Sequence, residues 1–93
     1  MELQDFKECI NIWIKPSTWH TNHFLDTERF HKALHRIFIK NGTKLEPEKF
    51  SKLLSQALID QYPKINSNFL NEQVKSAEIT YDVIRSYLFD ISE

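Results

Sequence analysis

The hydrophobic positions of this chain recur mainly at intervals of three and four residues, which is the spacing of an α-helix that buries one face. Between these stretches lie prolines, a glycine and polar residues that cap or interrupt helices. The predicted helices cover residues 2–14, 27–41, 47–62 and 68–91. The pattern therefore predicts an all-α fold, a small four-helix bundle-like domain that spans residues 1–93.

The first segment, residues 2–14, has two interpretations. Apolar residues at positions 3, 6, 10 and 13 follow helical spacing, whereas isoleucines at 10, 12 and 14 alternate as they would in a β-strand. A strand needs a partner, and every other apolar stretch of the chain has the helical period. We therefore favour a helix, ended by Pro16 because proline cannot continue the backbone hydrogen-bond ladder.

The two middle helices have clear boundary signals. Asp26 or Thr27 can cap the helix that starts there, and Gly42 suits the left-handed position that follows its end. Pro47 fits the first turn of the next helix, where its missing N–H costs nothing, and Pro63 stops that helix. The connections on either side of the third helix are therefore expected to be short.

The C-terminal segment carries an a/d heptad series over three heptads, with Ser67 or Asn68 as its expected cap. The series consists of Leu70, Val74, Ala77, Tyr81, Ile84, Leu88 and Ile91. Two versions remain open, because Thr80 can act as a second N-cap. The segment is either one long helix or two helices broken near residues 78–80.

This segment is also apolar outside its heptad series. The additional large residues are Phe69, Ile79, Val83, Tyr87 and Phe89. One helix of a small bundle needs only one apolar stripe, so these five residues are a candidate surface for a protein partner or a homodimer. The alternative is that this is a central helix whose extra apolar residues are covered by the other three.

In the broken version, the stretch from Ile79 to Leu88 resembles the turn and recognition helix of bacterial helix-turn-helix regulators. It shares an apolar residue and a hydroxyl cap, then an apolar pair and an aromatic–Leu pair. The resemblance implies a recognition helix over 81–89 whose residues at 81, 82, 85 and 86 face DNA. The sequence departs from the pattern at Glu78, where glycine is usual, and the nearby acidic side chains oppose phosphate.

Charge is unevenly distributed, although the net charge is only −1. Residues 29–52 hold seven Lys and Arg against two Glu, while residues 1–28 and 67–93 each have two basic residues against five acidic ones. Four of the basic residues form one line along the second helix, the basic stripe: Arg29, Lys32, Arg36 and Lys40. The stripe is a candidate contact for an anionic partner, either an acidic protein surface or nucleic-acid phosphate. The interpretation we favour is an ordinary solvated face whose cations pair with Glu28 and Glu48.

All four histidines lie close together, at His20, His23, His31 and His35. His31 and His35 are four residues apart, as in two-histidine zinc pairs, but no metalloprotease motif accompanies them, so no metal site is predicted. Cys9 lies on or beside an apolar face, where cysteine usually serves as a small hydrophobic residue. With one glycine and no nucleophile elbow, the sequence predicts neither an enzyme nor a cofactor.

The composition restricts the class of protein and the compartment in which we expect it. The 93 residues are 41% hydrophobic and 27% charged, which is typical of a globular domain. A lone cysteine and the lack of a signal peptide or an apolar run that could span a bilayer predict a cytoplasmic protein with no membrane contact. We expect a small regulatory or adaptor protein that acts by protein–protein interaction. The alternatives are a helix-turn-helix transcriptional regulator and an inhibitor or immunity-type protein that blocks its partner.

Overall fold

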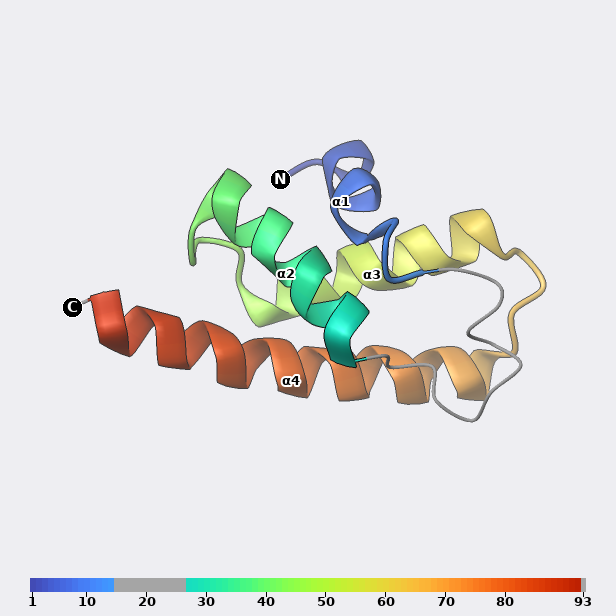
Figure 1. Cartoon of the computed structure of the whole chain (residues 1–93). Helices are drawn as coiled ribbons and strands as arrows, with labels where there is room; N and C mark the ends of the chain where they lie inside the picture. Colours follow the sequence, from blue (N-terminus) through green and yellow to red (C-terminus); the bar gives the residue numbers. More distant parts are fainter. Residues whose placement is uncertain (15–26, 93) are drawn as a thin grey trace. The chain divides into compact units, whose positions relative to one another are not determined.

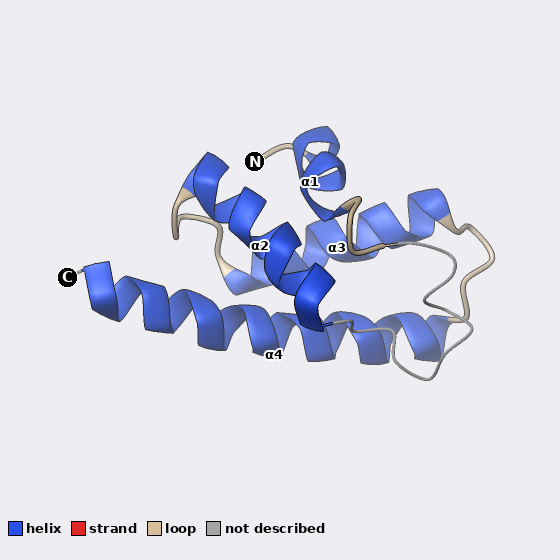
Figure 2. Ribbon diagram, in the orientation of Figure 1, coloured by secondary structure: helices blue, strands red, loops and turns tan. Residues whose placement is uncertain are grey.

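This computed structural model describes residues 1–14 and 27–92, whose regular secondary structure is α-helical, with turns and loops between the helices (Figure 2). At residues 27 and 89–92 the description covers the helical backbone without the side chains. The helices are α1 (Leu3–Ile10), α2 (Thr27–Asn41), α3 (Pro47–Gln61) and α4 (Ser67–Ser92), as Figure 1 shows. No strand occurs in the described ranges. The all-α prediction is confirmed, and the strand interpretation of residues 10–14 is wrong.

The chain divides into two compact units, Met1–Gly42 and Thr43–Glu93. Each unit contains one pair of packed helices, α1 with α2 and α3 with α4. The expectation of a single domain over residues 1–93 stays a prediction.

In the first unit, α1 and the turn that follows it pack against α2. Trp13 meets Phe30 edge to face, with ring centroids 4.8 Å apart and an interplanar angle of 72°. Most residues of the predicted helical stripes are buried, namely Phe6, Ile10, Trp13, Phe30, Ala33, Leu34 and Ile37, whereas Leu3 and Phe38 are half-buried. Cys9 is buried beside them on α1. Helix α1 is shorter than predicted, since residues 11–13 form a turn.

Gly42 ends α2 in the way its position predicted. Its φ is 62°, in the left-handed region that only glycine adopts without strain. Its N–H donates a 2.7 Å hydrogen bond to the carbonyl oxygen of Phe38, which satisfies one of the last carbonyls of the helix.

In the second unit, α3 and α4 lie side by side and run in opposite directions (Figure 1). Pro47 occupies the first turn of α3 as predicted, and α3 ends before Pro63. The apolar side of α3 is buried, through Phe50, Leu53, Leu54, Ala57 and Leu58. Facing residues of the heptad series on α4 are buried with them, namely Leu70, Val74, Ala77 and Tyr81.

The cap of α4 is one residue earlier than predicted. The side-chain oxygen of Asn66, rather than that of Ser67 or Asn68, accepts hydrogen bonds from two backbone N–H groups at the helix start. The donors are the N–H groups of Asn68, at 2.9 Å, and Phe69, at 3.1 Å. These are two of the four N–H groups that a helix leaves without partners at its N-terminus.

We predict that Asn66→Ala lowers the free energy of unfolding by about 1 kcal/mol, because two N–H groups lose their acceptor. Asn66→Asp, which keeps an acceptor oxygen at the same place, is expected to leave stability within about 0.5 kcal/mol of the parent. Urea denaturation followed by circular dichroism measures both. Equal losses in the two variants would show that the side chain does not act as a cap.

Candidate functional site

Helix α4 continues without a break through residues 78–80. The Thr80 hydroxyl donates a 3.1 Å hydrogen bond back to the carbonyl oxygen of Ser76, one turn earlier, so it does not cap a second helix. The predicted alternative of a broken segment is therefore wrong, and the turn that a helix-turn-helix motif requires is absent from Ser67–Ser92.

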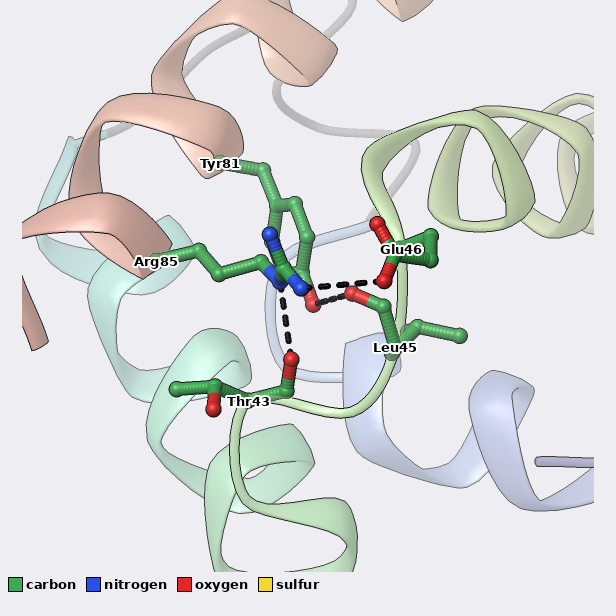
Figure 3. A network of polar contacts seen from close by, with 5 residues as sticks. All are labelled: Thr43, Leu45, Glu46, Tyr81 and Arg85. Carbon is green, nitrogen blue, oxygen red and sulfur yellow. Dashed lines mark hydrogen bonds and ion pairs between the residues drawn. The ribbon is translucent and has the colours of Figure 1, made fainter. Parts of the chain in front are cut away.

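Tyr81 connects α4 to the loop that precedes α3 through side-chain contacts (Figure 3). Its ring is fully buried and stacks on Phe50, with centroids 4.2 Å apart and an interplanar angle of 5°. Its hydroxyl donates a 2.5 Å hydrogen bond to the carbonyl oxygen of Leu45. The hydroxyl of a buried tyrosine thus satisfies a backbone carbonyl that is 36 positions away in the sequence.

One turn later, Arg85 binds the same loop. Its Nε donates a 2.8 Å hydrogen bond to the carbonyl oxygen of Thr43, and its Nη2 lies 3.1 Å from Oε1 of Glu46. Only 19% of the Arg85 side chain is exposed, against 69% for Glu46. We call these five residues the loop anchor: Thr43, Leu45, Glu46, Tyr81 and Arg85 (Figure 3).

The sequence reasoning did not find the loop anchor, and the helix-turn-helix alternative placed Tyr81 and Arg85 on a DNA-facing surface. Tyr81 is inside the fold instead, and the guanidinium of Arg85 is engaged with the loop. The burial of Tyr81 could have been predicted from its place in the heptad series, and a buried residue cannot face DNA. For Arg85 the sequence offers no such signal, because both of its partners are distant in the chain.

Helix α4 is longer than the helix it packs against. Its 26 residues span about 39 Å, compared with about 22 Å for the 15 residues of α3. The loop anchor places the start of α3 beside Tyr81 and Arg85, so the end of α4 continues past it within this unit (Figure 1). Burial of the heptad series falls off accordingly: Tyr81 is buried, whereas Ile84 and Leu88 are half-buried.

Three of the predicted partner-binding residues share one exposed row of α4. Ile79, Val83 and Tyr87 are four residues apart and are 58%, 63% and 65% exposed. Residues at this spacing are neighbours on a helix, so together they form one apolar ridge, which we call the α4 outer face. Phe69 is half-buried near the start of α4, and the side chain of Phe89 lies outside the described residues. The structure thus brings three of the five together.

The basic stripe keeps three of its four members exposed. Lys32, Arg36 and Lys40 lie on the outside of α2, whereas Arg29 is half-buried. Lys32 pairs with Glu28 at 3.4 Å, and Lys40 pairs with Glu8 at 3.8 Å. Ion pairs this exposed stabilise little and leave the cations available to a partner.

The histidine and cysteine positions do not converge on a metal site in the described part of the chain. His31 and His35 are exposed and line a hollow of about 440 Å³ on α2, while His20 and His23 lie outside the described residues. Among residues 1–14 and 27–92, no three His, Cys, Asp or Glu side chains converge as metal ligands. Cys9 is buried, and burial raises the pKa of its thiol, which disfavours the nucleophilic thiolate.

Within the described ranges, no helix has both the length and the apolar character needed to cross a bilayer. Comparison with protein-family models, with curated proteins and with solved structures finds no match to this chain.

We predict that Tyr81→Phe lowers the free energy of unfolding by about 1–2 kcal/mol, although it keeps the buried ring. The cost arises because the Leu45 carbonyl oxygen loses its donor inside the fold. Arg85→Gln is the companion variant, and it should cost less because its partner Glu46 is largely exposed. Denaturant titration of both variants checks this order, and the reverse order would contradict it.

The same hydroxyl makes stability depend on alkaline pH. Burial raises the pKa of Tyr81 to about 12, with Arg85 lowering it and Glu46 raising it by smaller amounts. The neutral hydroxyl is therefore favoured in the folded state. This contribution is fully present below about pH 10 and is lost as the pH rises from about 10 to 12. The parent protein should lose stability over that range more steeply than Tyr81→Phe, and identical pH profiles would contradict the assignment.

Proposed function

We propose that this protein is a small, non-enzymatic regulatory or adaptor protein that binds a protein partner through the α4 outer face. The observation that carries the proposal is the exposure of Ile79, Val83 and Tyr87 in one row. Scattered exposed apolar residues are ordinary on a protein surface, but a continuous ridge on one helix is typical of interaction sites.

The loop anchor supports this proposal energetically. Tyr81 and Arg85 alternate along α4 with Val83 and Tyr87, so each exposed residue is flanked by one that is bound to the loop. A ridge held on a fixed helix loses little conformational freedom when a partner binds. Burial of apolar area contributes about 25 cal/mol per Å², and tyrosine is among the residues that most often dominate binding.

Of the two alternative functions, DNA binding is less well supported, and an inhibitor or immunity-type protein would use the same surface. DNA binding through residues 81–89 would need Tyr81 and Arg85 to leave the loop anchor, and Asp82 would then face phosphate. An inhibitor or immunity-type protein would bind its target with the α4 outer face as well. In each protein-binding case, the basic stripe provides a second, electrostatic contact.

We also place the protein in the cytoplasm. Its one cysteine, Cys9, is buried and unpaired within the described residues. A reducing compartment keeps such a thiol free, whereas secreted domains of this size usually carry paired cysteines.

The proposal predicts that a photoreactive benzoylphenylalanine at position 87 crosslinks to another polypeptide when the full chain is expressed in its own cells. The same group at position 59 is the matched control, since Ile59 is also an exposed apolar residue, 48% exposed, but lies on α3. Val83→Lys in the chain labelled at 87 should abolish the crosslink. Because Val83 is exposed, this change should leave the free energy of unfolding within about 0.5 kcal/mol.

Mass spectrometry of the crosslinked bands provides the measurement. Equal crosslinking from positions 87 and 59, or no effect of Val83→Lys, would show that the α4 outer face is not a binding surface.

A further inference from the structure

The α4 outer face has an acidic border. On α4, Glu78 and Asp82 form the row next to Ile79 and Val83. With the start of α3 they enclose a hollow of about 490 Å³ on the second unit, lined by Glu46, Pro47, Glu48, Glu78, Ile79 and Asp82. A partner that fits this surface therefore has positively charged side chains next to apolar ones.

Most of these carboxylates have no cation of their own. Glu46 is paired with Arg85, but Glu48, Glu78 and Asp82 take part in no ion pair among the described residues. Four acidic groups around one hollow repel one another, and a cationic side chain placed there would relieve that repulsion.

The outside of α2 has the complementary composition. Lys32, Arg36 and Lys40 follow one another at four-residue intervals, and Ile39, which is 70% exposed, lies beside them. We call these four residues the basic α2 face. Arg36, Ile39 and Lys40 also line a hollow of about 250 Å³ with Glu8 and Cys9. Arg36 has no ion pair in the described part of the chain, so its charge is available.

We propose that the partner of the α4 outer face is a second copy of this chain, bound through its basic α2 face. This inference rests on the proposed function and identifies the partner. Apolar residues of α4 pack on Ile39, while Lys and Arg of α2 meet Glu78 and Asp82. We choose this partner because the two surfaces have complementary charge. The same molecule exposes an apolar surface with acidic neighbours on α4 and an apolar residue with basic neighbours on α2.

A reciprocal arrangement follows from the area that a stable dimer needs. Specific interfaces bury about 800 Å² per partner, and a contact made twice buries twice the area of a single contact. In a twofold dimer the contact is made twice, because each copy supplies both faces. Because α2 of one copy meets α4 of the other, the acidic border of one α4 is not placed against that of another.

Light scattering coupled to size exclusion tests the proposal on the full chain at low salt. The expected mass is twice the chain mass of 11.1 kDa, and it should fall toward one chain as salt is raised, because the charges are exposed. Two charge-reversal variants follow: Glu78→Lys with Asp82→Lys on α4, and Arg36→Glu with Lys40→Glu on α2. Each alone should weaken self-association about 100-fold or more, since attraction becomes repulsion at both contacts.

An equimolar mixture of the two variants should restore the dimer. In the mixed pair, one contact joins two unaltered faces and the other joins two reversed faces, so both are complementary. Lys52→Glu with Lys64→Glu is the control, because it changes the net charge as much as the α2 variant and lies outside both faces. It should remain dimeric, and thermal melts confirm that each variant is folded.

Three results would overturn this inference: a parent protein that is monomeric at all concentrations, variants that remain dimeric, or a mixture that stays monomeric. A parent that is monomeric but shifts mixed-sequence DNA, with loss of the shift in the α2 variant, would assign the basic α2 face to phosphate instead. The crosslinking experiment separates the two proposals. A crosslink from position 87 to a different polypeptide supports the proposed function and overturns self-association, whereas no crosslink overturns both.

Discussion

The attachment of α4 to the loop before α3 determines which side of this helix faces outward. Tyr81 and Arg85 donate hydrogen bonds to three acceptors of that loop, two backbone carbonyl oxygens and one carboxylate, and Tyr81 also stacks on Phe50. Rotation of α4 about its axis would break these bonds and expose a buried tyrosine. With this rotation fixed, residues two positions before and after Tyr81 must lie on the opposite side of the helix, because successive residues are separated by 100°.

The fixed rotation of α4 determines both which of its residues are buried and which are exposed. The same helix contributes a buried series, ending at Tyr81, and the exposed ridge of Ile79, Val83 and Tyr87. The buried series stabilises the α3–α4 pair, while the ridge contributes little to the stability of the chain alone. The exposure of these large apolar side chains supports the proposal that they are buried in an assembly. The acidic border of the ridge then restricts which surfaces can cover it.

The sequence predicted most of the helical framework because its signals are local. Helical spacing identified the buried stripes of α2, α3 and α4, and Gly42 and Pro47 marked boundaries through their own backbone preferences. The cap at Asn66 was missed because three adjacent residues can all cap a helix, and only the backbone path selects one. The role of Arg85 was missed because its partners are 39 and 42 positions away, and no local pattern encodes such a pairing.

Radical footprinting can compare the two tyrosines of α4, since Tyr81 is buried and Tyr87 is exposed. In dilute purified protein, Tyr87 is expected to be oxidised rapidly and Tyr81 slowly. In cells, the proposed partner would cover the α4 outer face, so Tyr87 should become protected to the level of Tyr81. Equal reactivity of Tyr87 in the dilute protein and in cells would show that nothing binds over this face.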